Sequence, residues 1–326
     1  MFLYQITDDH VQILGCRGYD GSIRVPEKIG GLPVIELAAY TFSDGWGKRE
    51  VLSSAGKEIR LCDEEGNPIK IQEKDFPPEI SCERLNEIYL PHTIRKIGNY
   101  AFYNCYELSS VECFSSIFDV GSGLFTGCLG VRFLNIHIID GERSCMKELL
   151  AELRQLLFVT YSSTKGEANL VFPEMYEESV EHTPAKIILR EMHGCGHMYR
   201  YCFDRTEFQF HKYDALFPHI LVQEPERVTA ALVLGRLYTP VDLLEKYKEV
   251  YEAYLMKHFK GAARLAIKEK DPALFLWLAQ KYGHNQEDFD GMVDLAGNGD
   301  RPEVLSELMK LRRQRFKAVK RKFFLT

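Results

Sequence analysis

The sequence predicts a multi-domain α+β protein: a short, β-rich repeat solenoid, then a small β-ribbon, then an antiparallel α-helical repeat array. Two observations support this prediction. The phrase KIGNYAFYNC, which begins at Lys96, recurs as DVGSGLFTGC from Asp119, 23 residues later. Toward the end of the chain, a pattern of helix, short turn and proline recurs at a spacing of 30, from Gly261 to Gly291. We therefore expect three segments: 1–140, 141–224 and 225–326.

The composition is typical of a folded protein. Of 326 residues, 45% are hydrophobic and 27% charged, which is too apolar for a disordered chain. The net charge of −6 disfavours a chain that coats nucleic acid along its whole length. No apolar run is long enough for a membrane span, and the opening MFLYQITDDH lacks the basic region of a secretory signal. Nine cysteines cannot all pair within the chain, so we expect reduced thiols in the cytoplasm.

The first segment contains a 23-residue repeat whose apolar positions persist from copy to copy. The recurring sets are Cys82, Cys105 and Cys128; Leu85, Leu108 and Val131; Ile88, Val111 and Leu134; Ile97 and Val120; Phe102 and Phe125. One coil buries about seven apolar groups, each stabilising by roughly 1.5–3 kcal/mol. Ordering its backbone costs roughly 1–2 kcal/mol per residue. A single coil is therefore unstable alone, and neighbouring coils must stack to complete its burial.

Within each copy, LNEIYL and LSSVEC alternate in the manner of strands. Gly98 and Gly121 follow, where a tight coil requires either a positive φ or a missing side chain. A more divergent copy comes earlier if five residues are inserted after its proline. It aligns Ile23 with Ile88, Val25 with Leu90, Pro26 with Pro91, Leu37 with Ile97 and Phe42 with Phe102.

Two further features surround this early copy. YQITDDHVQIL predicts a hairpin around Asp8 and Asp9 that caps the open end of the solenoid. An insertion at about 43–81 contains EIRLCDEEGNPIKI, which predicts two strands and a turn. We interpret the insertion as either a degenerate coil or a protruding hairpin.

The pattern I..IG..AF..C..L..V, together with the opener YQITDDHVQILGCRGYDGSIRVPEKIGGLPVIEL, resembles the BspA-type leucine-rich repeat family, which is common in bacteria. The resemblance covers roughly residues 1–139, and a period of 23 suits leucine-rich repeats. It implies a short right-handed solenoid with a sheet along one face, and a role in binding proteins or surfaces rather than in catalysis. Many relatives are exported, whereas this sequence shows no export signal.

The middle segment, 141–224, predicts a helix, a linker and a ribbon. SCMKELLAELRQLLFV (144–159) has apolar residues at helical spacing, with Ser144 as its N-cap. YSSTKGEANLVFPEMYEESVEHTP predicts a loop and a possible hinge. Tyr199, Tyr201 and Phe203 alternate with polar neighbours, which predicts a ribbon of two or three strands that turns at DRT.

The last segment predicts paired helices. GAARLAIKEKDPALFLWLAQKYG aligns with GMVDLAGNGDRPEVLSELMKLRR, with Pro272 and Pro302 at the first position of the second helix in each pair. PERVTAALVLGRLYTP and VDLLEKYKEVYEAYLMKHF supply two more amphipathic helices. The segment weakly resembles a degenerate ankyrin-like array, although TPLHxA is missing and 30 residues is short of 33.

Three groups of residues carry possible chemistry, and each has a simpler explanation. His193, Cys195, His197 and Cys202 could hold Zn²⁺, but their spacing differs from that of known fingers, and we favour a glycine-rich turn without metal. The cysteines at 82, 105 and 128 could be redox-active, but a repeat demands a small buried group there. The tail KLRRQRFKAVKRK (310–322) has eight basic residues that could bind nucleic acid or anionic lipid. It also suits a solvated helix end.

No catalytic motif and no complete nucleophile–base set is present, so we predict no catalytic residues and no cofactor. The outward positions of the repeat strands remain as the candidate site. The chemistry of these positions varies from coil to coil, which is typical of a recognition surface. A solvated surface without a partner, or a surface covered by the helical half of the chain, could vary in the same way. The predicted partner-binding residues are Ser22, Arg24, Glu87, Tyr89, Ser110, Glu112, Phe133 and Asn135.

These features predict a cytoplasmic, non-enzymatic scaffold that binds a protein or peptide through the leucine-rich-repeat sheet, the helical array or both. One alternative is nucleic-acid or anionic-membrane binding through the basic tail, and another is a metal-dependent enzyme at the His193–Cys202 ribbon. The sequence identifies neither the partner nor the oligomeric state.

Overall fold

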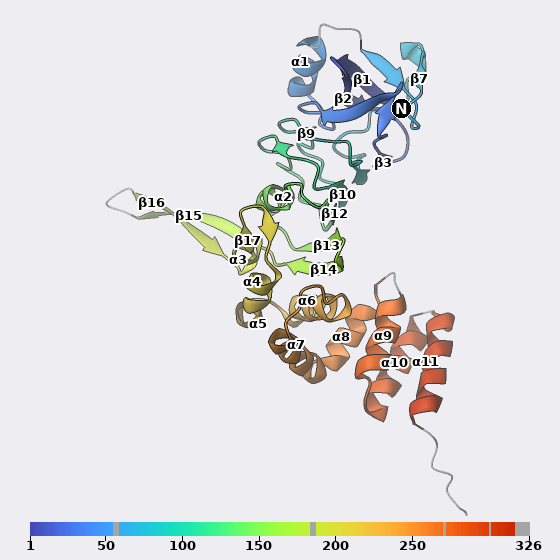
Figure 1. The fold of residues 1–326 in the computed structure, drawn as a ribbon, viewed down its shortest axis with the longest axis vertical. Coiled ribbons are helices and arrows are strands. Elements are labelled where there is room, and N and C mark those ends of the chain that lie inside the picture. Colours follow the sequence, from blue (N-terminus) through green and yellow to red (C-terminus); the bar gives the residue numbers. More distant parts are fainter. Residues whose placement is uncertain (55–58, 183–186, 270–271, 300, 317–326) are drawn as a thin grey trace, which may run out of the picture. The chain divides into compact units, whose positions relative to one another are not determined.

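The computed structural model describes residues 1–54, 59–182, 187–269, 272–299 and 301–316 of a mixed α/β chain. The chain divides into two compact units, Met1–Gln223 and Glu224–Thr326 (Figure 1). The first unit holds the sheets and the second is helical in its described part.

The first unit begins with the predicted hairpin. β1 (Phe2–Thr7) and β2 (His10–Cys16) pair antiparallel around a turn in which Asp8 has a φ of +53°. The hairpin lies inside an eight-stranded sheet of order β11-β9-β5-β2-β1-β6-β7, with β4 paired to β5. Its other strands are β4 (Lys28–Ile29), β5 (Leu32–Leu37), β6 (Arg60–Cys62), β7 (Pro68–Ile69), β9 (Lys96–Ile97) and β11 (Asp119–Val120).

The insertion at about 43–81 forms a helix and a paired hairpin. α1 (Trp46–Ser54) comes first, then β6 and β7, then a 3₁₀ turn at Glu73–Asp75. β6 pairs antiparallel with both β1 and β7, so the hairpin extends the eight-stranded sheet and does not protrude from it.

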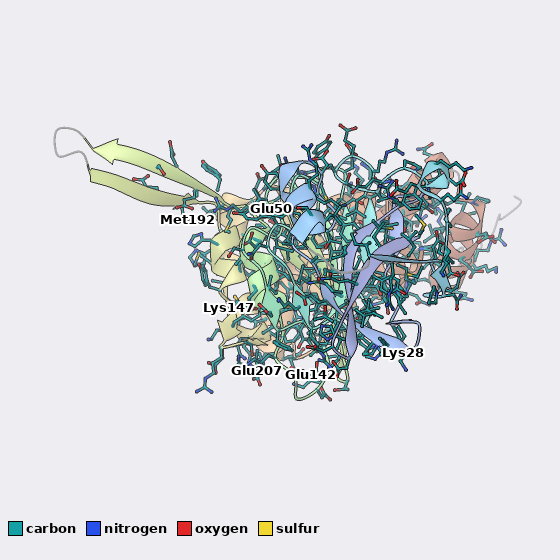
Figure 2. All side chains as sticks on the ribbon, turned by 90° about the horizontal axis from the view of Figure 1, so that it is seen from above. Lys28, Glu50, Glu142, Lys147, Met192 and Glu207 are labelled. Carbon is teal, nitrogen blue, oxygen red and sulfur yellow. The ribbon has the colours of Figure 1, made fainter. Side chains whose placement is uncertain are left out.

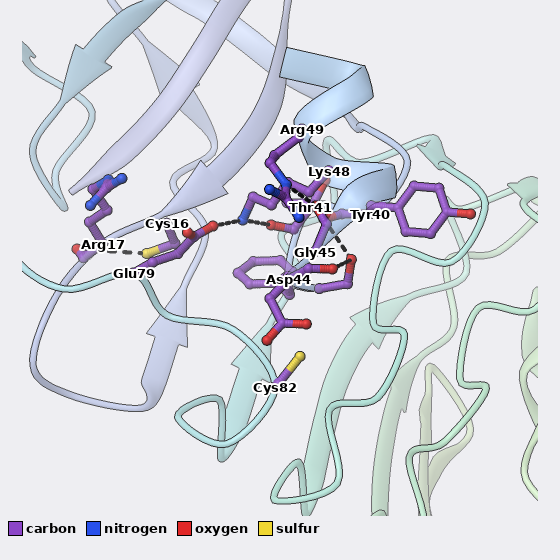
Figure 3. Close-up of polar contacts among 12 residues, drawn as sticks. Cys16, Arg17, Tyr40, Thr41, Asp44, Gly45, Lys48, Arg49, Glu79 and Cys82 are labelled. Atoms are coloured by element: carbon purple, nitrogen blue, oxygen red, sulfur yellow. Dashed lines mark hydrogen bonds and ion pairs between the residues drawn. The ribbon is translucent and has the colours of Figure 1, made fainter. Parts of the chain in front are cut away.

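A buried lysine connects α1 to the repeat through polar contacts. The Lys48 ammonium donates a hydrogen bond to the Thr41 carbonyl at 2.8 Å and pairs with Glu79 (Figure 3). Lys48 is only 4% exposed, and these two partners offset the free-energy cost of burying its ammonium group. Thr41 in turn donates to the Ala38 carbonyl at 2.6 Å, which links α1 to the end of β5.

A six-stranded sheet of order β14-β13-β12-β10-β8-β3 forms the second face of the repeat. Its strands are β3 (Ser22–Arg24), β8 (Glu87–Tyr89), β10 (Ser110–Phe114), β12 (Phe133–His137), β13 (Leu157–Ser163) and β14 (Gly166–Phe172). All neighbours pair parallel except β13 and β14. The inward positions align across five strands: Ile23 is half-buried, and Ile88, Val111, Leu134 and Val159 are buried. The 23-residue period therefore corresponds to one rung of this sheet.

Aromatic rings and thiols run through the stacked coils. The rings of Phe42, Phe102 and Phe125 stack with centroids 5.4 Å apart at each step, tilted by only 8° and 9°. Each following thiol donates to a phenylalanine carbonyl: Cys105 to Phe42 at 3.2 Å, and Cys128 to Phe102 at 2.8 Å. The alignment of Phe42 with Phe102 is therefore confirmed.

Gly98 and Gly121 lie where the backbone of the neighbouring coil leaves no room for a side chain. Neither has a positive φ. A Cβ on Gly98 would lie within 3.0 Å of the Ala39 backbone, and one on Gly121 within 3.0 Å of the Asn99 backbone. These glycines set how closely successive coils approach.

The middle segment differs from its prediction in three places. The helix predicted at 144–159 ends early as α2 (Met146–Glu152), because the chain must then supply β13, the next rung. The predicted loop is wrong: it contains β14 and β15 (Tyr176–His182), and β15 pairs with β16 (Ile187–His193). This hairpin projects from its unit in both views (Figures 1 and 2).

The ribbon predicted at Tyr199 is also wrong in its first strand. That stretch is α3 (Gly196–Arg200), which buries the Tyr199 ring against Tyr213. The predicted turn is present: β17 (Phe203–Asp204) pairs with β18 (Glu207–Phe208), followed by α4 (Phe210–Ala215) and α5 (Phe217–Gln223).

Two side chains hold this region to the six-stranded sheet. Arg200 is 3% exposed and donates to the carbonyls of Leu153, Pro173, Gly196 and Gln155. Burial lowers the pKa of its guanidinium to about 10. The Tyr213 hydroxyl accepts from the Val171 amide at 2.9 Å and donates to the Val171 carbonyl at 2.7 Å. The outer edge of β14 is therefore covered.

The second unit consists of helices over its described residues. They are α6 (Glu226–Tyr238), α7 (Glu245–Lys257), α8 (Phe259–Ala266), α9 (Pro272–Tyr282), α10 (Gln286–Asn298) and α11 (Pro302–Arg315). α8 packs on α9 and α10 on α11, and each second helix begins at the predicted proline. The aligned residues Leu278 and Leu308 are both buried.

Replacing Gly121 with alanine tests the close approach of coils. The new methyl group would overlap backbone atoms of the neighbouring coil, so we expect Gly121→Ala to lower the free energy of unfolding by about 1–3 kcal/mol. Urea unfolding followed by circular dichroism measures it. Gly297→Ala in α10 is the matched control, because its methyl group meets no atom within 4 Å and should stabilise by about 0.5–1 kcal/mol. Equal stability of wild type and Gly121→Ala would contradict this packing.

Candidate interaction surface

The eight predicted partner-binding residues lie in two rows across the six-stranded sheet. The first row runs through Ser22, Glu87, Ser110 and Phe133, which are paired in register. The second row runs through Arg24, Tyr89, Glu112 and Asn135. The sheet therefore brings together residues that are up to 113 positions apart, from Ser22 to Asn135.

Contacts within the rows fix the orientation of their side chains. The Ser22 hydroxyl donates to the Glu87 carboxylate at 3.2 Å. The Arg24 guanidinium lies 3.7 Å from the centre of the Tyr89 ring, in a cation–π contact. Phe133 is 49% exposed, an unusual position for so large an apolar side chain.

The sequence prediction missed a continuation of the first row. β13 joins the sheet beyond β12 and places Phe158 opposite Phe133, with ring centroids 5.8 Å apart. The step from Phe133 to Phe158 is 25 residues, so the 23-residue period does not find it. The two phenylalanines form an apolar area at the start of these strands.

A third row, also missed, centres on Phe114. Its ring stacks on His137 at 4.7 Å and receives the edges of Tyr89 at 6.2 Å and His92 at 6.0 Å. Phe114 and His137 face each other in register. Continuing the in-and-out alternation past Glu112 would have found both residues.

Carboxylates border this aromatic cluster. Glu112 lies 2.9 Å from His137 Nε2, and Glu27 lies 3.5 Å from His92 Nδ1. The three rows thus combine aromatic faces with acidic groups, a composition that recognition surfaces share.

The alternative metal site does not assemble. His193 stacks on Tyr176 and lies 3.1 Å from Glu178, while His197 contacts the Gly194 carbonyl. Cys202 donates to the Met198 carbonyl at 3.5 Å. Among the described residues, no three His, Cys, Asp or Glu side chains are grouped to hold a metal ion.

Three of the four cations of α11 have partners within the chain. Lys310 pairs with Glu307 at 2.6 Å, and Arg312 with Asp290 at 2.5 Å. Arg315 donates to the Gln280 carbonyl at 2.6 Å and thereby caps the end of α9. The rest of the predicted basic tail, from residue 317, lies outside the described residues.

Comparison with known proteins identifies the repeat. Residues 69–163 match the family model described as BspA type leucine rich repeat region, in six copies. This stretch runs from the end of β7 to the end of β13 and is a BspA-type leucine-rich repeat region. It extends past residue 139, where the resemblance in the sequence ended.

A solved structure, the crystal structure of the T. pallidum leucine-rich repeat protein (TpLRR), is similar to this chain. The two are 20% identical, and the match covers 41% of this chain and 68% of that one with a TM-score of 0.23. No curated protein matches the chain. None of the helices in the described part of the chain has the length and apolar character needed to cross a lipid bilayer.

The cysteines should be inert in the folded chain. All nine are free and buried. Burial raises the pKa of the Cys16 thiol to about 11 and that of Cys62 to about 12, so both remain protonated at neutral pH. Hydrogen bonding to Cys128, and then burial, raises the pKa of Cys105.

We therefore expect fewer than about one thiol in nine to react quickly with Ellman's reagent at pH 8, and all nine to react in denaturant. Rapid stoichiometric labelling of Cys82, Cys105 or Cys128 in the native chain would contradict a structural role for these thiols.

Proposed function

We propose that this chain is a non-enzymatic interaction protein whose leucine-rich repeat forms a short solenoid and binds a protein or peptide through the outward face of the six-stranded sheet. One observation carries the proposal. Thirteen outward positions on five strands line up in three rows, and these rows expose aromatic rings and carboxylates, whereas a buried core would keep apolar residues at every copy of a position.

The energetic basis is that of other recognition surfaces. Large aromatic side chains supply most of the binding energy when a partner covers them, and surrounding polar groups discriminate between partners. Phe133 and Tyr89 meet this requirement because each is held by neighbours before binding: Phe133 by Phe158 and Tyr89 by Arg24 and Phe114. Little side-chain freedom then remains to be lost on association.

The helical unit supplies a second repeated surface, and we include it in the proposal as a further place for a partner to bind. We also place the protein in the cytoplasm, where nine free thiols remain reduced. Binding through the basic tail is the competing function, and it predicts a steep loss of affinity with salt.

Removing the two aromatic anchors tests the sheet face. We expect the double variant Tyr89→Ala, Phe133→Ala to weaken binding of a partner isolated from native lysate by about tenfold or more. The measurement is a dissociation constant for the purified partner. Tyr201→Ala and Phe118→Ala are matched controls, because these aromatics are 71% and 68% exposed away from the three rows.

The circular dichroism spectrum of the double variant must match that of the wild type, so that the loss of binding is not caused by unfolding. A partner that binds the double variant as well as the wild type would move the site away from the sheet. Binding that disappears between low and physiological salt, with Tyr89 and Phe133 irrelevant, would favour the basic tail instead.

A further inference from the structure

The two edge strands of the six-stranded sheet differ in whether their outward backbone groups are hydrogen-bonded. At one edge, Tyr213 bonds both the amide and the carbonyl of Val171, so β14 cannot accept another strand there. At the other edge lies β3, which among the described strands pairs only with β8. An unpaired edge of this kind is a template for a further strand.

The backbone of β3 shows which groups remain available. The Gly21 carbonyl accepts from the Glu87 amide at 3.2 Å, and the Val25 amide donates to the Tyr89 carbonyl at 3.0 Å. Backbone groups alternate in direction along a strand, so the amide and carbonyl of Arg24 point away from β8. The Ser22 amide is bound by the Asp20 carboxylate at 2.9 Å, which leaves Arg24 at the centre of the open edge.

A groove runs along this edge. It has a volume of about 440 Å³, and its lining includes the stretch from Ser22 to Glu27. Cys16, Arg17 and Ile80 also line it, and the β6–β7 turn contributes Glu64 and Glu65. This volume falls within the range of sites that bind ligands.

The groove carries more carboxylates than cations. Its acidic residues are Asp20, Glu27, Glu64 and Glu65, and its cations are Arg17, Arg24 and the amino group of Met1. Each cation is already engaged: Arg17 lies over Phe76 and donates to Pro77, Arg24 lies over Tyr89, and the amino group donates to the Arg17 carbonyl. Glu64 and Glu65 are exposed and form no salt bridge within the described residues.

We propose that this groove receives an extended segment of a partner that carries lysine or arginine side chains and adds to β3 as a seventh strand of the sheet. The added backbone bonds to Arg24, and alternate basic side chains reach the carboxylates. The proposal rests on the proposed function and names the partner chemistry. β3 is three residues long, so the added ladder is short and the carboxylates supply much of the selectivity.

The test uses the full chain and a blocked eight-residue peptide of alternating lysine and threonine. Its affinity is measured by fluorescence anisotropy. We expect the same peptide with glutamate in place of lysine to bind at least tenfold more weakly. Two further peptides carry backbone N-methyl groups, one at every lysine and the other at every threonine. One of the two should bind at least tenfold more weakly than the unmethylated peptide, because its methyl groups block the amides that would hydrogen-bond to β3.

Protein variants locate the site. The double variant Glu64→Gln, Glu65→Gln should bind the lysine peptide about fivefold more weakly than the wild type. Glu148→Gln with Glu152→Gln on α2 is the matched control, because it removes the same charge from exposed residues elsewhere in the unit. Hydrogen exchange of the Arg24 amide should slow by at least tenfold when the peptide binds.

Several results would overturn the proposal. They are no measurable binding of the lysine peptide, equal binding of both N-methylated peptides, or an equal loss in the Glu64/Glu65 and Glu148/Glu152 variants. If a partner's binding nevertheless depends on Tyr89 and Phe133, the sheet face stands and only the groove fails. If it depends on neither residue, the proposed function fails as well.

Discussion

Contact between successive coils of the repeat is the constraint on which the first unit depends. Phe102 is buried only because Phe42 and Phe125 cover its two faces. The thiol of Cys128, from the next coil, donates a second hydrogen bond to the Phe102 carbonyl, which also accepts from the Cys105 amide. Gly121 allows the coils to approach closely enough for both contacts. Aromatic stacking, thiol hydrogen bonding and backbone approach therefore all act between neighbours.

The same stacking creates the candidate interaction surface. When inward residues align in register, outward residues must align too, because side chains alternate along each strand. Glu87, Ser110 and Phe133 consequently form a row although their chemistry differs. A repeat of this kind separates two tasks: constant inward positions hold the coils together, and variable outward positions are free to recognise a partner. Elements outside the repeat extend both sheets: the β1–β2 and β6–β7 hairpins continue the eight-stranded sheet beyond β5, and Tyr213 bonds the outer strand β14 of the six-stranded sheet.

The parts of the fold that repeat were predictable from the sequence, and the parts that do not repeat were not. Period and alternation located the buried column from Ile88 to Leu134 and all eight outward residues, including Ser22 and Arg24 across a long insertion. The helix predicted at 144–159 is wrong beyond Glu152, because leucines at helical spacing are also compatible with a short helix followed by a buried strand. Phe158 was missed because the last coil is two residues longer than the others. Near Tyr199, alternating aromatics fit strand and helix equally, and tertiary contacts with Tyr213 decide between them.

A double-mutant cycle on the phenylalanine column tests nearest-neighbour stacking most directly. Phe42→Leu, Phe102→Leu and Phe125→Leu are made singly and in pairs, and the free energy of unfolding is measured for each. We expect coupling of about 0.5–1.5 kcal/mol for Phe42 with Phe102 and for Phe102 with Phe125. For Phe42 with Phe125, which do not touch, we expect the effects to add within about 0.5 kcal/mol. Additive effects for the two adjacent pairs would contradict nearest-neighbour stacking.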